Sequence, residues 1–273
     1  ADDEQPGAGG AKNNNASHRR VSINQSTFAM SHAAGSVMQP GIPALQAWHD
    51  HGLGPDTPDP SVTIQQVDVP DEGRFWVAHK TSDNGDGTFR YEYAVFNLNS
   101  HASGGSFAVP LPEGVTATNI GFHDVNYHSG EPFDNSDWTV ENAGGTLRWR
   151  SPQTFAQNPN SNALRWGTMY NFWFDADAAP ADGQATLGLF RPHTPDSVMF
   201  TASVPGEVGG GCSTDWNNDE SVNSSDISSY LGAWLESINQ GNLAADFNAD
   251  LTVNSADISA FLTAWIDEVT GGC

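Results

Sequence analysis

Two twelve-residue segments near the C-terminal end of this 273-residue chain carry oxygen-bearing side chains at matching positions. In both, positions one, three, five, seven, nine and twelve are Asp, Asn, Ser or Thr. A calcium ion takes about six to eight oxygen ligands, and a short loop supplies them by turning alternate residues inward. The pattern therefore predicts two bound Ca²⁺ ions, one in each loop. The expected ligands are Asp215, Asn217, Asp219, Ser221, Asn223 and Asp226 in the first loop, and Asp246, Asn248, Asp250, Thr252, Asn254 and Asp257 in the second.

Each loop runs into a segment with helical periodicity. Apolar residues recur three and four positions apart from Ile227 onward and from Ile258 onward, which gives each segment one apolar stripe. Asn223 and Asn254 stand three residues before the last aspartate of each loop, the spacing of a capping box that starts a helix. We therefore expect two helices, joined by residues 236–245, whose apolar stripes pack together.

The pair of segments resembles a type I dockerin domain. Both loops have the form Asp-x-Asn-x-Asp-x-x-Val-Asn-Ser-x-Asp, and the resemblance covers about residues 212–273. The family usually has Gly at the sixth loop position, where the backbone turns sharply, but Glu220 and Leu251 stand there in this chain. The resemblance implies a cohesin-like partner protein, gripped by the helix face beside each loop. The corresponding partner-binding residues are Ser224, Ser225, Ser255 and Ala256.

Both cysteines of the chain bracket this region. Cys212 precedes the first loop and Cys273 is the last residue. A disulfide between them would close a loop of about 60 residues and stabilise the small module by about 4 kcal/mol in the chain-entropy model. Such bonds are typical of secreted domains.

Composition points to the same compartment. The net charge of -23 makes nucleic acid and anionic membrane surfaces poor partners. No apolar run has the length of a membrane span. Ala1 and the acidic, Gly-rich stretch after it are typical of a mature N-terminus left by signal-peptide cleavage, and glycosylation sequons begin at Asn15 and Asn24. We expect a secreted protein, extracellular or on the cell surface.

The rest of the chain predicts a mostly β protein. Alternating apolar and polar residues, punctuated by Gly, Asn and Asp clusters, are typical of an antiparallel β-sandwich. The expected order is an extended N-terminal arm with a short helix (1–60), the β-sandwich (61–203), a Gly-rich linker (204–211) and the small helical calcium module (212–273).

Apolar residues of the arm favour self-association. From Arg20 to Met30, the apolar residues Val21, Ile23, Phe28 and Met30 fit an extended strand with a break near Gln25. Such a strand could complete the sheet edge of a neighbouring copy.

The β body offers weaker signals for chemistry. His49, Asp50 and His51, or His123, Asp124 and His128, could hold a metal ion, although nothing fixes their spacing on one element.

Tryptophans offer a sugar-binding alternative. Trp138 and Trp149, flanked by charged residues, are the better candidates for an exposed sugar-binding surface, whereas Trp76 and Trp173 lie in apolar runs and are expected in the core.

Three functions remain open at this point, one of them a secreted metalloenzyme that uses the histidine groups. The first is a secreted, non-catalytic structural or adhesive protein, a subunit of an extracellular fibre or surface assembly held by its arm and calcium module. The alternative is a dockerin-bearing carbohydrate-binding or polysaccharide-degrading protein anchored to a cohesin scaffold. No catalytic motif identifies an enzyme.

Overall fold

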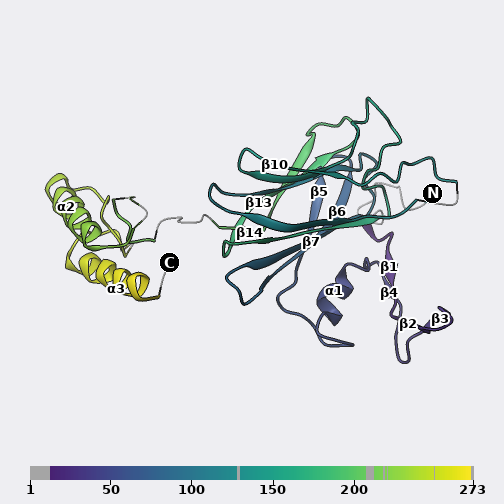
Figure 1. Cartoon of the computed structure of the whole chain (residues 1–273), viewed down its shortest axis with the longest axis horizontal. Helices are drawn as coiled ribbons and strands as arrows, with labels where there is room; N and C mark the ends of the chain where they lie inside the picture. Colours follow the sequence, from purple (N-terminus) through teal and green to yellow (C-terminus); the bar gives the residue numbers. More distant parts are fainter. Residues whose placement is uncertain are drawn as a thin grey trace. The chain divides into compact units, whose positions relative to one another are not determined.

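The structure is a computed structural model that describes residues 13–127, 130–206, 212–217, 219, 221–248 and 250–271. It divides into two compact units, residues 1–206 and 207–273 (Figure 1). The first unit is built mostly from antiparallel strands and the second carries the two long helices, so the predicted fold class is confirmed.

Two five-stranded sheets form the first unit. One consists of β5 (Thr63–Val69), β6 (Gly73–Asp83), β7 (Phe89–Asn97), β12 (Met169–Ala176) and β9 (Ala117–His123), in that spatial order. The other consists of β10 (Thr139–Ala143), β11 (Thr146–Arg150), β8 (Gly104–Pro110), β13 (Pro180–Leu189) and β14 (Ser197–Pro205). All neighbouring strands pair antiparallel.

The inner faces of the two sheets share one aromatic core. Tyr91 and Phe174 stack with ring centroids 5.0 Å apart, and Phe107 of the opposite sheet lies 4.7 Å from Phe172. Aromatic side chains bury large apolar areas, and such pairs add a further contribution beyond burial. The core follows from period-two alternation, because every second residue of a strand faces the other sheet.

The sequence pattern does not predict every strand or strand end. β8 begins within the Ser103–Gly105 segment, whose composition is typical of a turn. Every side chain of β10 is exposed, so this strand has no apolar alternation. Val204 and Pro205 belong to β14, so this strand extends two residues into the predicted linker. Residues 207–211 lie outside the described part of the chain.

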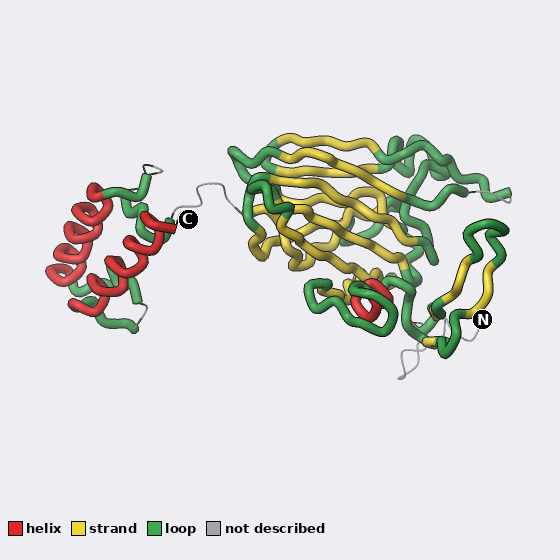
Figure 2. The backbone as a smooth tube through the Cα atoms, turned by 60° about the horizontal axis from the view of Figure 1, so that its bottom comes forward, coloured by secondary structure: helices red, strands yellow, loops and turns green. Residues whose placement is uncertain are grey.

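The arm is a hairpin rather than a single strand. β2 (Val21–Ile23) pairs with β3 (Met30–His32), and β1 (Ser17–His18) pairs with β4 (Gln39–Pro40). The structure has a turn at the predicted break near Gln25, where the Asn24 side chain accepts hydrogen bonds from the main-chain N–H groups of Ser26 and Thr27. Phe28, with a φ of 54°, does not lie in a strand as predicted. Figure 2 shows the β2–β3 hairpin standing away from the sandwich.

Helix α1 (Gln46–His51) lies against the outer face of the β5–β9 sheet. Leu45, beside its first turn, is buried among Ala78 and Ala94 of that face. The helix therefore covers part of a sheet surface that would otherwise be open to solvent.

The second unit contains α2 (Ser224–Gln240) and α3 (Ser255–Gly271). Tyr230 and Phe261 stack at its centre with ring centroids 4.1 Å apart and planes 4° apart. Both are fully buried, and burial raises the pKa of Tyr230 to about 12. No helix among the described residues is long and apolar enough to cross a membrane.

Candidate calcium and partner site

The first half of each loop brings the side chains of positions one, three and five together. The main-chain N–H of Asp219 donates to Oδ1 of Asp215 at 3.1 Å and to Oδ1 of Asn217 at 2.9 Å. The Asn217 amide in turn donates to Oδ2 of Asp219 at 2.9 Å. Three oxygen-bearing side chains thus converge on one side of the loop.

The last residue of the loop closes it. Asp226 is fully buried, and its two carboxylate oxygens accept from the main-chain N–H groups of Asn217 at 3.2 Å and Asn223 at 2.8 Å. The Asn223 side chain accepts from the N–H of Ser225, which completes a capping box at the start of α2. Burial raises the pKa of Asp226, but the N–H donors of Asn223, Asn217 and Trp216 outweigh it and lower the pKa overall.

The second loop repeats this network bond for bond. The N–H of Asp250 donates to Asp246 at 3.2 Å and to Asn248 at 3.0 Å. Asp257 is also fully buried and accepts from Asn248 at 3.2 Å and Asn254 at 2.8 Å. The two loops therefore have the same internal geometry wherever both are described.

The loop residues fit a calcium ion. The set mixes carboxylate, amide and main-chain oxygens. The Asn223 amide N–H donates to the main-chain oxygen of Ser221 at 2.9 Å, and the Asn254 amide N–H donates to that of Thr252 at 3.1 Å. Among the described residues, no three His, Cys, Asp or Glu side chains cluster on their own. Ca²⁺ accepts such mixed oxygen sets, and bound there it would supply the charge that holds them together.

The sixth position of the second loop has the backbone conformation that normally selects glycine. Leu251 has a φ of 67° and its side chain is 76 % exposed. A residue with a Cβ in this region costs roughly 1–2 kcal/mol. The loop thus makes the turn of a calcium loop in spite of the leucine, whereas Glu220 of the first loop lies outside the described residues.

Each loop is also held by the helix that follows the other loop. The indole N–H of Trp234 in α2 donates to the main-chain oxygen of Asn254 at 2.9 Å. The indole N–H of Trp265 in α3 donates to that of Asn223 at 3.0 Å. Both tryptophans belong to the apolar stripe of their helix. Their matching places in the repeat were the sequence signal for a shared role.

Glu268 of α3 joins the last helix of the second unit to the segment before its first loop. Its carboxylate accepts from the N–H and the hydroxyl of both Ser213 and Thr214, with the two Ser213 bonds at 2.9 and 2.7 Å. Burial raises the pKa of Glu268, but these donors outweigh it and lower the pKa. Cys212 adjoins this contact, whereas Cys273 lies outside the described residues, so their disulfide stays a prediction.

The predicted partner-binding residues of the two helices lie on exposed surface. Ser224, Ser225, Ser255 and Ala256 are all exposed at the first turns of α2 and α3. The arm residues Val21, Ile23 and Phe28 are 39 %, 52 % and 77 % exposed. Asn15 and Asn24, the two sequons, are exposed as well.

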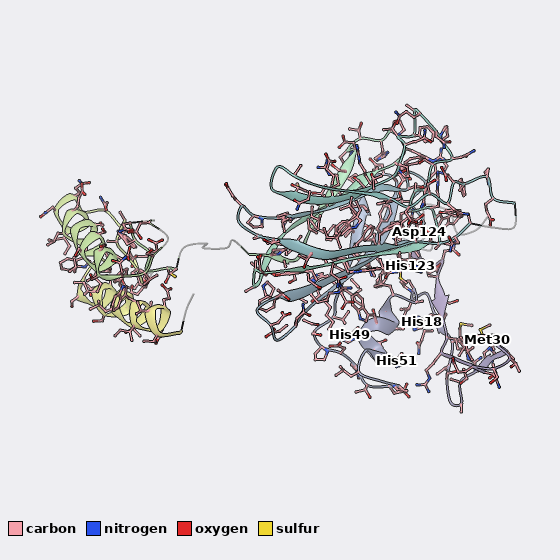
Figure 3. All side chains as sticks on the ribbon, viewed as in Figure 1. His18, Met30, His49, His51, His123 and Asp124 are labelled. Atoms are coloured by element: carbon pink, nitrogen blue, oxygen red, sulfur yellow. The ribbon has the colours of Figure 1, made fainter. Side chains whose placement is uncertain are left out.

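The histidine groups are not brought together as metal sites within the described residues. His49 and His51 lie on α1, and His123 and Asp124 lie at the end of β9 (Figure 3). His49 contacts its neighbour Asp50 at 2.9 Å, and Asp124 accepts a hydrogen bond from Asn162. His128 lies outside the described residues.

The two tryptophans chosen as sugar-binding residues are buried. Trp138 is 4 % exposed and Trp149 is 0 % exposed, so neither can stack on a glycan. Trp149 faces inward because neighbours on a strand face opposite sides, so Arg148 and Arg150 point outward while Trp149 points into the core. Trp138 precedes β10, and its indole N–H donates to the main-chain oxygen of Asn162 at 3.0 Å.

Comparison with known proteins identifies the second unit. The family model of the type I dockerin domain matches residues 213–261, which span both loops and the start of α3. No curated protein matches the chain. The C-terminal region therefore carries a type I dockerin domain, a class of calcium-binding modules that bind partner proteins.

Proposed function

We propose that this chain is an extracellular protein whose dockerin domain anchors it, in a calcium-dependent manner, to a cohesin domain of another protein. The observation that carries this proposal is the bond-for-bond identity of the two loops, each followed by a helix with an exposed apolar stripe. The loops set the first turns of both helices, so calcium would determine the shape of the surface that a partner meets.

The α2 stripe has the chemistry of a docking surface. Ser224 and Ser225 lie beside the loop, and Leu231, Leu235 and Ile238 follow at helical spacing with exposures of 37 %, 56 % and 48 %. Exposed apolar side chains gathered on one face are typical of interaction sites.

The same arrangement recurs on α3. Ser255 and Ala256 precede Ile266 and Val269, which are 54 % and 47 % exposed. The domain thus presents two related faces for a partner.

Isothermal titration calorimetry against a panel of type I cohesin domains tests the anchoring. We expect binding in millimolar calcium, none in excess chelator, and a loss of about tenfold or more in affinity for Leu235→Asp, since a charge at the centre of an apolar contact is not satisfied. Val140→Asp, at a similarly exposed position of the sandwich, is the matched control. Binding to no member of the panel, or equal binding in chelator, would count against the proposal.

A second candidate function, self-assembly into a fibre, rests on the arm hairpin. Val21 and Ile23 on β2, with Phe28 and Met30 beside them, are exposed on an element that stands away from the sandwich. Phe28→Ser would convert a sedimenting oligomer to monomer if the hairpin joins copies. A protein that is monomeric at high concentration in calcium would contradict this function.

We also propose that the sandwich is not an enzyme. The sequence carries no catalytic motif, and three acidic side chains of the sandwich have partners: Asp124 accepts from Asn162, Asp134 accepts from Ser136, and Glu141 lies 3.9 Å from Arg150. Release of reducing sugar from cellulose or xylan, abolished by an acidic-to-amide substitution in the sandwich, would overturn this.

A further inference from the structure

A hollow of about 310 Å³ lies between α1 and the outer face of the β5–β9 sheet. Its walls come from three elements: Leu45 and Trp48 at α1, Glu92 on β7, and Asn171 and Trp173 on β12. The volume is at the lower end of the range of about 300–1,000 Å³ found for small-molecule sites.

The sheet side of this hollow includes the small residue Ala94 on β7. Residues on one rung of the sheet run Ile64, Ala78, Ala94, Asn171 and His123 across the five strands. Ala94 lines the hollow with only a methyl group, while Ala78 beside it packs in the cluster that contains Leu45.

Two indoles border the hollow, one from the sheet and one from α1. Trp173 lies flat across the neighbouring strand β9, where a Cβ at Gly121 would overlap its ring. The guanidinium of Arg90 is 5.5 Å from the centre of this ring. Trp48 on α1 is half-buried and contacts the same sheet face.

Two polar side chains of the hollow have no partner among the described residues. Glu92 and Asn171 are half-buried, yet neither side chain makes a hydrogen bond or ion pair there. Lys80, directly opposite Glu92 on β6, instead binds Asp59 at 2.8 Å. Both side chains are therefore available to hydrogen-bond a ligand that carries hydroxyl groups.

We propose that this hollow binds a neutral glycan built from pyranose units with equatorial hydroxyls, such as glucose or xylose. An indole matches the flat C–H face of such a ring. The Glu92 carboxylate accepts from two neighbouring hydroxyls, and the Asn171 amide both donates and accepts. The net charge of -23 opposes acidic polysaccharides.

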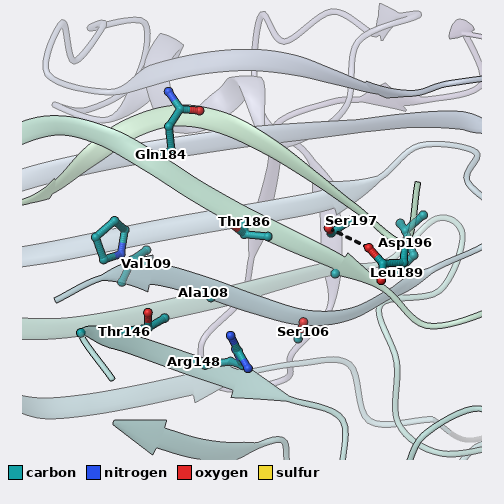
Figure 4. Close-up of a pocket in the computed structure, with 13 residues that line it drawn as sticks. Ser106, Ala108, Val109, Thr146, Arg148, Gln184, Thr186, Leu189, Asp196 and Ser197 are labelled. Atoms are coloured by element: carbon teal, nitrogen blue, oxygen red, sulfur yellow. Dashed lines mark hydrogen bonds between the residues drawn. The ribbon is translucent and has the colours of Figure 1, made fainter. Parts of the chain in front are cut away.

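A second hollow, over the opposite sheet, lacks these features. It has a volume of about 470 Å³ and lies over Ser106, Thr146, Arg148, Gln184 and Thr186 (Figure 4). No aromatic side chain lines it, and its Asp196 carboxylate accepts a hydrogen bond from the Ser197 hydroxyl at 3.1 Å.

Calorimetric titration of the full chain with cellohexaose, xylohexaose and trigalacturonate tests the site. We expect binding of at least one neutral probe and not of the acidic one. Trp173→Ala and Glu92→Ala should each raise Kd about tenfold or more, and Asn171→Ala several-fold, because aromatic and charged contacts dominate small interfaces. Trp173→Phe, which keeps a ring, should lose less than Trp173→Ala.

The matched controls are Trp166→Ala, Glu113→Ala and Arg148→Ala, three exposed positions outside the hollow. They should leave Kd unchanged, and thermal melting should show that all variants fold. No binding of either neutral probe at millimolar concentration, stronger binding of trigalacturonate, or equal losses in the controls would overturn the proposal. A different occupant would also overturn it. If the hollow receives the Phe28 hairpin of a second copy, Trp173→Ala should convert an oligomer to monomer, and no glycan should bind.

This site is independent of the anchoring function. Asp226→Ala with Asp257→Ala should abolish cohesin binding and leave glycan affinity unchanged, whereas Trp173→Ala should do the reverse.

Discussion

Trp265 of α3 and Asn223 of the first calcium loop are joined by a hydrogen bond of 3.0 Å from the indole nitrogen to the main-chain oxygen. Trp234 and Asn254 form the equivalent bond in the opposite direction, at 2.9 Å. Each helix therefore follows one loop and fastens the other. Asn223 and Asn254 stand at the starts of α2 and α3. Because each accepts a hydrogen bond from the other helix, a change in either loop should affect both helices.

Trp265→Phe keeps a large ring and removes the donor. Asn223 then loses a partly buried partner, and we expect the dockerin domain to lose about 1 kcal/mol of stability. Calcium titration should show weaker binding in the first loop, although the substitution lies after the second. Trp166→Phe, exposed on the sandwich, is the control. An effect confined to the second loop would contradict the crossed arrangement.

Leu251→Gly removes a side chain from a residue with a φ of 67°. The folded loop should gain about 1 kcal/mol, which is about fivefold in calcium affinity for the second site. Calorimetric calcium titration measures the change directly. Leu243→Gly, at an exposed leucine that does not have positive φ, should give no gain. Unchanged or weaker calcium binding in Leu251→Gly would argue that the turn carries no strain.

Asp59 should titrate far below an ordinary aspartate. The hydrogen bond from Lys80, assisted by Ser61, lowers its pKa to about 2. A lowered folded pKa means that this contact stabilises the fold above the unfolded pKa of about 3.9 and loses that contribution as pH falls toward 2. Carboxyl NMR titration should give a midpoint near 2, and Lys80→Met should move it upward. A midpoint near 4 in the unaltered chain would refute the contact.

Glu268→Ala should loosen the ends of the dockerin domain, because four donors of Ser213 and Thr214 lose their acceptor. We expect a loss of about 1–3 kcal/mol, larger under reducing conditions if Cys212 and Cys273 are bonded. Thermal melting with and without reductant separates the two effects. Asp267→Ala, the exposed neighbour, should have little effect. Equal melting temperatures of the two variants would show that the contact of Glu268 with Ser213 and Thr214 contributes nothing to stability.

The calcium loops were predictable because their ligand spacing is local. Positions one to twelve are read directly from Asp215 to Asp226, and the helix starts follow from Asn223 and Asn254. The crossed tryptophan bonds join residues 42 and 20 positions apart, so spacing alone could not pair them.

The sandwich surface was harder to predict because an apolar run does not say which face a residue takes. Trp173 was expected in the core, but it alternates with Tyr170, Phe172 and Phe174 and therefore faces outward. Trp149 was expected outside and faces inward for the same reason. The pairing of Asn171 on β12 with Ala94 on β7 brings two walls of the hollow together, and sequence spacing does not predict that pairing.

Calcium titration of the metal-free chain is the most direct test of the central claim that both loops bind an ion. The unaltered chain should bind two ions, Asp226→Ala one, and Asp226→Ala with Asp257→Ala none. Melting of the dockerin domain should rise with calcium only where a loop is intact, because an ion bound by the folded state adds its binding energy to stability. Equal calcium binding by the unaltered chain and the double variant would contradict the assignment of both loops.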